Sequence, residues 1–202
     1  MTTLKNFPDT IALFPLNVVL FPSGLLELRI FEIRYLDMIK DCLRNQEEFG
    51  IVLVKSSLEN TSTLNVETIG TLAKIVSFDQ GTDGLLHITV QGTKPFQING
   101  CSIESNGLIV GKIQPHLTEH EKVLGSHTNL VDLPNKILTD NRGHETETQK
   151  PSLLSEASWV AYRLAEFLDL TNQEKLTVLS ESNAQRKLDK IEQLIVHHSS
   201  EC

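Results

Sequence analysis

The sequence lacks any hydrophobic run long enough to cross a membrane. Its longest apolar stretches are Ile11–Phe14 and Ile51–Val54, whereas a spanning helix needs about 20 apolar residues. The first residues, Met1–Pro8, contain no cationic segment followed by an apolar core, so no secretory signal is recognised. We therefore expect a cytoplasmic protein with no membrane partner.

Cysteine is scarce as well. The three cysteines, Cys42, Cys101 and Cys202, lie far apart in the chain. An odd number without a CxxC pair predicts neither a disulfide framework nor the spacing of a metal-binding site. Reduced thiols in a cytosolic protein account for them.

The sequence also has no cluster of basic residues. The net charge is -8, and both halves are acidic: residues 1–117 hold 9 basic and 12 acidic side chains, and residues 118–202 hold 9 and 14. Binding to nucleic acid through phosphates needs clustered Lys and Arg, so we expect no nucleic-acid partner. With 40% hydrophobic and 22% charged residues, the composition is typical of a compact globular protein.

Motifs for catalysis and metal binding are missing too. Gly92-Thr93-Lys94-Pro95 is the nearest fragment to a phosphate-binding P-loop and does not match it, and no GxSxG motif is present. Ser23 stands in Pro-Ser-Gly, which predicts a turn. His116 and His120 are separated by Thr118, a predicted helix cap, and no Cys or carboxylate stands at ligand spacing. We expect no catalytic residue, no metal and no cofactor.

Short apolar and β-branched runs, separated by turn residues, dominate the first 115 residues and predict strands. One helix interrupts them, because the apolar residues between Tyr35 and Leu43 recur at helical spacing. Asn106-Gly107 predicts a type I′ hairpin turn, in which both central residues need positive φ. The predicted strands are Thr10–Phe14, Leu25–Ile30, Phe49–Val54, Gly70–Phe78, Leu85–Val90, Phe96–Glu104 and Leu108–Gln114.

The pattern becomes helical from Thr118 onward. An apolar face predicts a helix over Ser152–Asp169 and a last helix around Leu188–Ile195. A hydroxyl residue three positions before Glu or Gln forms a capping box, which satisfies free N–H groups at a helix start. Three such pairs occur: Thr118 with Glu121, Thr171 with Glu174, and Ser182 with Gln185.

These patterns together predict an α+β protein. Residues 1–117 form a β-rich part with one inserted helix, and residues 118–202 form a helical bundle that we expect to pack on it.

Several segments resemble the N-terminal, substrate-binding domain family of Lon proteases. The similarity runs through nearly the whole chain. It is carried by Ile11–Gly24 (IALFPLNVVLFPSG), Leu28–Tyr35 (LRIFEIRY), Phe49–Val52 (FGIV), Ile69–Ile75 (IGTLAKI), Val90–Phe96 (VQGTKPF) and Trp159–Ala165 (WVAYRLA).

The resemblance implies a PUA-like pseudo-barrel followed by a helical bundle. It also implies a non-catalytic role in recognising unfolded or tagged substrates. In Lon proteases an ATPase module and a Ser-Lys protease follow this domain. This chain ends at Cys202 before either could begin, so we expect a stand-alone module without catalytic parts. The chain departs from the family pattern at Pro134 and the polar segment after it, so we expect the first bundle helix to be less regular than in the family.

Two groups of residues are candidates for substrate binding. Arg29, Glu32, Arg34 and Tyr35 lie where a predicted strand meets the predicted helix. A structural interpretation pairs Arg29 or Arg34 with Glu32 and uses Tyr35 to anchor the helix. A functional interpretation places part of this group in a ligand groove.

The second group consists of Val18 and Phe21. In the apolar segment Asn17–Pro22, successive side chains of an extended chain point to opposite sides, so they cannot all face one core. Either another part of the chain covers this patch or it is open to a client protein.

We therefore expect a protein- or peptide-binding module. Its partners are unfolded or peptide segments of client proteins, with a separate protease as a further candidate partner. Two alternatives remain: an RNA-binding protein, since PUA-like barrels elsewhere bind RNA, and a small-molecule enzyme whose site is assembled from scattered residues. The acidic balance speaks against RNA.

Overall fold

A computed structural model of the chain describes residues 7–55, 65–119, 122–123, 127, 130 and 156–200. The chain divides into two compact units, Met1–His116 and Leu117–Cys202. The described residues form a mixed α+β structure with one six-stranded sheet and four helices. All six strands and helix α1 belong to the first unit, and helices α3, α4 and α5 belong to the second.

The strands follow the predicted pattern closely, with one correction. Two strands were predicted between Leu85 and Glu104, but the structure has one continuous strand there. Gly92 and Pro95 lie inside it and pair with the neighbouring strand instead of forming a turn. The strands are β1 (Thr10–Leu16), β2 (Leu25–Ile30), β3 (Phe49–Val54), β4 (Val66–Gln80), β5 (Leu86–Ile103) and β6 (Ile109–Pro115).

Gly92 has a packing role that explains this correction. A Cβ atom at Gly92 would overlap the carbonyl oxygen of Phe21. The N–H of Gly92 donates to Gly24 O (2.9 Å), and the N–H of Ser23 donates to Gly92 O (2.7 Å). The glycine therefore lets the Phe21–Gly24 turn approach the strand closely, and it does not end the strand.

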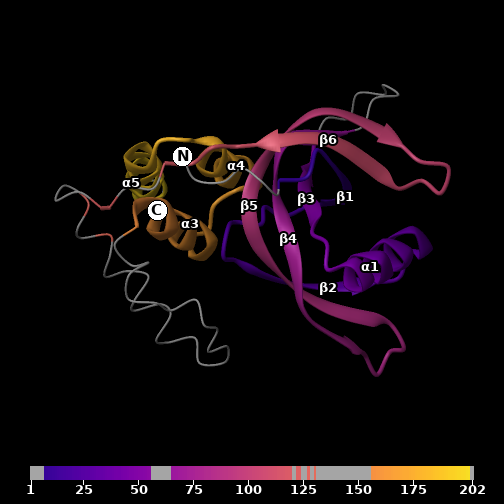
Figure 1. Cartoon of the computed structure of the whole chain (residues 1–202). Coiled ribbons are helices and arrows are strands. Elements are labelled where there is room, and N and C mark those ends of the chain that lie inside the picture. Colours follow the sequence, from indigo (N-terminus) through magenta and orange to yellow (C-terminus); the bar gives the residue numbers. More distant parts are fainter. Residues whose placement is uncertain are drawn as a thin grey trace. The chain divides into compact units, whose positions relative to one another are not determined.

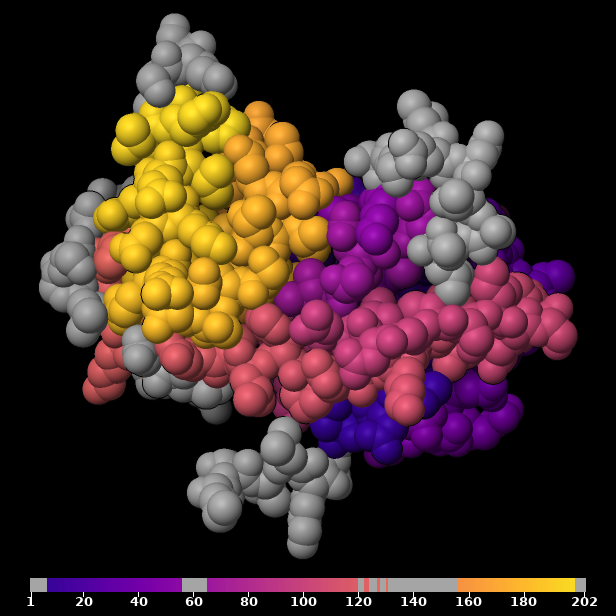
Figure 2. Space-filling view, turned by 90° about the horizontal axis from the view of Figure 1, so that it is seen from above, coloured from indigo at the N-terminus to yellow at the C-terminus, as the bar shows by residue number. Residues whose placement is uncertain are grey.

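Five of the strands form a closed ring of pairings. The sheet order is β2-β5-β4-β3-β1-β6, and β6 also pairs with β5, which closes the ring β5-β4-β3-β1-β6. β1 and β3 run parallel, and the other pairs are antiparallel. β2 pairs with β5 and lies outside the ring. Figure 2 shows the pink to salmon residues of β5 and β6 as a continuous band of surface.

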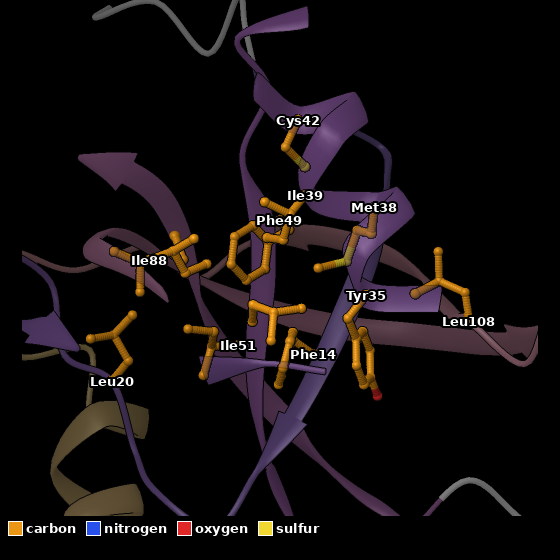
Figure 3. Close-up of a cluster of buried hydrophobic side chains, with 13 residues drawn as sticks. Phe14, Leu20, Tyr35, Met38, Ile39, Cys42, Phe49, Ile51, Ile88 and Leu108 are labelled. Carbon is orange, nitrogen blue, oxygen red and sulfur yellow. The ribbon is translucent and has the colours of Figure 1, made fainter. Parts of the chain in front are cut away.

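Helix α1 (Ile33–Asn45) fills the main core of the first unit. Its side chains Tyr35, Met38, Ile39 and Cys42 point toward Phe14, Phe49 and Ile51, as Figure 3 shows. The rings of Phe14 and Tyr35 stack with centroids 4.1 Å apart. In Figure 1 the helix lies between the β4–β5 hairpin and the β5–β6 hairpin, and both hairpins contribute apolar residues to the same core. A second, smaller core lies around Leu13, Val52, Leu72 and Phe96.

The predicted type I′ turn at Asn106-Gly107 is wrong. Gly107 has positive φ (84°), but Asn106 is not among the described residues with positive φ. The N–H of Gly107 donates to Glu104 O (2.9 Å), and the N–H of Glu104 donates to Leu108 O (2.8 Å). This is a longer hairpin loop in which a glycine in the left-handed region follows a β-turn. The side-chain oxygen of Asn106 accepts from the N–H of Leu108 (2.8 Å), which fixes the loop locally.

The helices described in the second unit are α3 (Ala157–Phe167), α4 (Asn172–Ser180) and α5 (Ala184–Ser200). The capping box of Thr171 and Glu174 is confirmed: the Thr171 side chain accepts from the Glu174 N–H, and the Glu174 side chain accepts from the Thr171 N–H. The predicted helix over Ser152–Asp169 begins at Ala157 among the described residues, because the preceding Glu156 is extended and forms a β-bridge with Lys122.

Two other predicted caps are not used. Thr118 begins no helix within the described residues, since residues 116–119 are irregular and Lys122 lies in the β-bridge; its predicted partner Glu121 lies outside the described residues. Ser182 does not cap α5. Asn183 does so instead, because its side-chain oxygen accepts from the N–H of Arg186 (2.9 Å).

Candidate functional site

The candidate site is the junction where β2 leads into α1. Glu32 is the N-cap of α1 and has an extended backbone (φ -80°, ψ 133°). Its carbonyl oxygen accepts from the N–H groups of Tyr35 and Leu36, each at 3.0 Å. Its side chain makes no cap hydrogen bond, so the carboxylate is available to a neighbouring cation.

Arg34 supplies that cation and holds the junction together. Its Nη2 lies 2.7 Å from Oε2 of Glu32, and its Nε donates to the same oxygen at 2.9 Å. Its Nη1 donates to the carbonyl oxygen of Gly107 at 2.7 Å. Its guanidinium also lies 4.6 Å from the centre of the Tyr35 ring. One side chain thus links the helix start, the core aromatic and the β5–β6 loop.

Two large apolar side chains flank this ion pair and are open to solvent. Phe31 is 70% exposed and Ile33 is 76% exposed. Together with Glu32, Arg34 and Asn106 they line a shallow hollow, which we call the junction surface. Neighbouring exposed apolar side chains are one feature of contact sites for other molecules.

The sequence contained a signal for Phe31 and Ile33, although they were not predicted. In β2 the inward residues alternate with outward ones, and Ile30 is buried, so Phe31 falls on the outward side. In α1 the buried residues are Tyr35, Met38, Ile39 and Cys42. Ile33 lies on the opposite side of the helix from them. Apolar residues on faces that should be polar are the signal that was missed.

Of the predicted group, Glu32, Arg34 and Tyr35 come together as described. Tyr35 is buried, and burial raises the pKa of its hydroxyl, although Arg34 opposes the rise. The structural interpretation of this group therefore holds for Arg34, which pairs with Glu32, and for Tyr35, which anchors the helix. Arg29 is not part of this ion pair.

Arg29 lines a second hollow on the outer face of β2, β5 and β4. Cross-strand register places it opposite His87, which lies opposite Asp79. Nε2 of His87 lies 3.1 Å from Oδ2 of Asp83. The pKa of Asp83 is lowered, first by the hydrogen bond from the N–H of Leu85 and then by His87. The side chains at this hollow carry both signs of charge, so they do not indicate one kind of ligand.

The two predicted apolar residues, Val18 and Phe21, differ in exposure. Val18 is 40% exposed, whereas Phe21 is fully buried. Phe21 lies in a turn in which the N–H of Gly24 donates to Phe21 O (2.9 Å) and Ser23 has positive φ (64°). This confirms the turn role of Ser23. The Phe21 side chain is not available to a client while this turn is folded.

The described residues contain no group of three or more His, Cys, Asp or Glu that could hold a metal ion. His120 lies outside the described residues, and His198 Nε2 contacts Glu174 Oε1 at 3.1 Å. In the same described part of the chain, no helix combines the length and apolar character needed to cross a bilayer.

Comparisons with known proteins identify similar chains. The family model of the ATP-dependent protease La (LON) substrate-binding domain matches residues 10–197. A Lon protease from Parabacteroides distasonis is 32% identical over 112 residues, which are 54% of this chain and 14% of that protein. This chain spans between 11% and 23% of the length of the curated Lon proteases that it matches.

Solved structures show the same relationship. The crystal structure of a Lon N-terminal domain protein from Xanthomonas campestris is 32% identical, with a TM-score of 0.74, covering 93% of this chain and 97% of that chain. The N-terminal domain of the Mycobacterium avium complex Lon protease has a TM-score of 0.59 at 12% identity, covering 90% of this chain and 95% of that chain. The second similarity concerns the fold alone.

Proposed function

Because the chain belongs to the family of the ATP-dependent protease La (LON) substrate-binding domain, we propose that it binds polypeptide segments of client proteins and performs no chemistry of its own. The observation that carries this proposal is the junction surface. Phe31 and Ile33 are exposed by 70% and 76%, and burying two such side chains against a client would contribute about 3 to 6 kcal/mol before the costs of association.

The predicted binding residues divide into contacts and supports. Arg34 and Glu32 present fixed charges beside the apolar pair, and Tyr35 holds the helix that carries them. Val18, which is 40% exposed, and Arg29 on the outer sheet face extend the area that a long client segment could touch. Phe21 supports the Pro22-Ser23-Gly24 turn from inside.

The finer features implied by the family are part of the same proposal. Residues 1–117 form a PUA-like subdomain, residues 118–202 form a helical bundle, and the protein works in the cytoplasm on unfolded client segments. The ring of strand pairings and the three helices described in the second unit are compatible with this division. A separate protease is the proposed recipient of a bound client.

The test is a titration with reduced, carboxymethylated lactalbumin carrying a fluorescent label, followed by anisotropy. We expect saturable binding to the wild-type chain. Phe31→Ser and Ile33→Ser should each weaken it about tenfold, because each removes the burial of one large apolar side chain. Val196→Ser is the matched control, since Val196 is 68% exposed and lies on α5 of the second unit. Absence of binding by the wild type, or equal weakening by all three variants, would contradict the proposal.

A further inference from the structure

Strand β2 has one edge that no described residue occupies. It pairs with β5 through all of Leu25–Ile30. In the part of the chain that the structure describes, no other hydrogen bond reaches the backbone of these residues. β2 lies outside the closed ring. A row of unpaired N–H and C=O groups at a sheet edge is a template for another strand.

The register tells which backbone groups point to this open edge. The N–H of Gly92 donates to Gly24 O at 2.9 Å, so the backbone polar groups of Gly92 face β2, one step beyond the pair Leu25 and Gln91. Hydrogen-bonded and non-bonded pairs alternate along an antiparallel ladder. Leu26, Leu28 and Ile30 therefore bond to β5, and the N–H and C=O groups of Leu25, Glu27 and Arg29 point outward.

β2 also differs from two other long strand segments with an open edge. Residues 74–80 of β4 and residues 98–103 of β5 each have one neighbour among the described strands, and each pairing contains a register shift. Such bulges twist an edge away from a partner. The pairing of β2 with β5 has no shift, and β2 contains no proline. Of these three long segments, β2 has the edge without a bulge.

Exposed apolar side chains lie at both ends of this edge. Leu25 is 37% exposed at its start, and Phe31 and Ile33 of the junction surface follow its end. Glu27 and Arg29 lie between them on the exposed face. An added strand would set its residues opposite Glu27 and Arg29, where side chains of opposite charge are favoured.

We propose that the open edge of β2 receives an extended segment of a client polypeptide as an added strand. The proposal rests on the proposed function and names where and how the client binds. The segment would be extended, apolar at alternate positions and able to place an apolar residue on Phe31 and Ile33. Backbone hydrogen bonds supply sequence-tolerant affinity, and the flanking apolar groups select unfolded segments.

The test uses a proline at an outward-pointing position. Glu27→Pro removes the outward N–H but leaves the bonds from Leu26 and Leu28 to β5, and proline is tolerated on an edge whose N–H faces solvent. Glu27→Ala is the matched control, because it removes the same carboxylate and keeps the N–H. The probe is a fluorescein-labelled decapeptide with Val at alternate positions and Lys and Glu between them. We expect Glu27→Pro to weaken its binding about tenfold or more and Glu27→Ala by less than about threefold.

A second measurement keeps the test decisive if Glu27→Pro fails to fold. Decapeptides N-methylated at alternate residues keep their side chains but lose the backbone N–H donors along one edge. Methylation of the edge that pairs with β2 should abolish binding to the wild type. Methylation of the opposite edge should not. The amides of Leu25, Glu27 and Arg29 should exchange with solvent rapidly in the free protein and slowly with the peptide bound.

The possible results separate the two proposals. Suppose that the decapeptide binds the wild type and Glu27→Pro equally, and that both methylated peptides bind the wild type as well as the decapeptide does. The edge is then not the site, and the proposed function stands. If neither the decapeptide nor carboxymethylated lactalbumin binds the wild type, the proposed function fails as well. If ultracentrifugation shows a dimer that Glu27→Pro dissociates and the peptide does not bind, the edge pairs with a second copy, and the client proposal is overturned.

Discussion

In the first unit the ion pairs of the described residues have side chains at least 32% exposed, whereas the second unit buries cations among its helices. Thr71 is the buried polar residue described in the first unit, and its hydroxyl donates to Leu20 O at 2.6 Å. The buried polar residues of the second unit include Lys187, which has no exposed surface, and Arg163, which is 8% exposed. Backbone pairing between strands closes the ring in the first unit. The helices of the second unit instead enclose long polar side chains.

Lys187 is a buried cation whose burial lowers the stability of the second unit. Its Nζ donates to the Ser158 hydroxyl at 3.2 Å and lies 4.7 Å from the centre of the Tyr162 ring. These are neutral partners. Burial lowers the pKa of Lys187 to about 7, although the more distant carboxylates of Glu181 and Glu119 oppose the shift. The second unit therefore carries a penalty for burying a cation, and this penalty depends on pH near neutrality.

The largest expected effect comes from removing this buried amine. In the unfolded chain Lys187 binds a proton below about pH 10.5, and in the folded unit below about pH 7. Between these values the unfolded state holds more protons, so the free energy of unfolding rises with pH. Lys187→Met should abolish this rise and stabilise the unit near pH 7 by on the order of 3 to 4 kcal/mol. Trp159 of α3, the single tryptophan, reports on urea unfolding at each pH.

Arg186→Met is the control for this prediction. Arg186 lies on the same helix and is exposed, so its replacement should leave the rise with pH intact. Burial also raises the pKa of Glu166, and Arg163 at 2.7 Å opposes that rise. Glu166 acts on the acid side of pH 7 and leaves the alkaline slope unchanged. An unchanged slope in Lys187→Met would show that the lysine is not buried in solution.

The next effect concerns the close backbone packing of the first unit. A Cβ atom at Gly70 would lie 2.5 Å from the carbonyl oxygen of Ile51 and 2.7 Å from the Phe96 ring. A backbone oxygen held in the sheet cannot move aside, so Gly70→Ala should lower the free energy of unfolding by about 2 to 3 kcal/mol. Circular dichroism of the β-signal during thermal unfolding measures it.

Gly100→Ala provides the comparison within the same sheet. A Cβ atom at Gly100 would meet nothing within 4 Å, so this variant should stay within about 0.5 kcal/mol of the wild type. If both variants lost the same free energy of unfolding, steric overlap of the added Cβ atom would not be the cause.

Sequence patterns predicted the strands well because the first unit is built from short apolar and β-branched runs separated by turn residues. Leu25–Ile30 and Phe49–Val54 have the predicted bounds. The same patterns predicted a strand break at Gly92. The glycine is needed because Phe21 O approaches it closely, and no local sequence pattern reveals this contact. Lys187 could not be predicted as buried either, because its burial depends on where α3 places Ser158 and Tyr162.

The candidate site shows the same limit. Glu32, Arg34 and Tyr35 are neighbours in the sequence, so their grouping was predictable. The hydrogen bond from Arg34 to Gly107 O joins residues 73 positions apart, and it is the long-range pairing of β5 with β6 that creates it. Arg29 was grouped with Glu32 by proximity in sequence, but it lies on the strand face that carries His87 and Asp79.

The smallest expected effect tests whether the surface ion pair of the first unit stabilises the fold. The side chains of Arg34 and Glu32 are 32% and 41% exposed, so solvent screens their attraction, and a double-mutant cycle with alanine should give a coupling below about 1 kcal/mol. Arg34→Ala should cost about 1 kcal/mol more than Glu32→Ala, because it also removes the hydrogen bond to Gly107 O at 2.7 Å. Urea unfolding of the four chains measures both quantities. Equal losses for the two single variants would mean that Arg34 does not hold the β5–β6 loop in solution. A coupling well above 1 kcal/mol would mean that the pair is desolvated, and surface pairs of the first unit would then resemble the buried cations of the second.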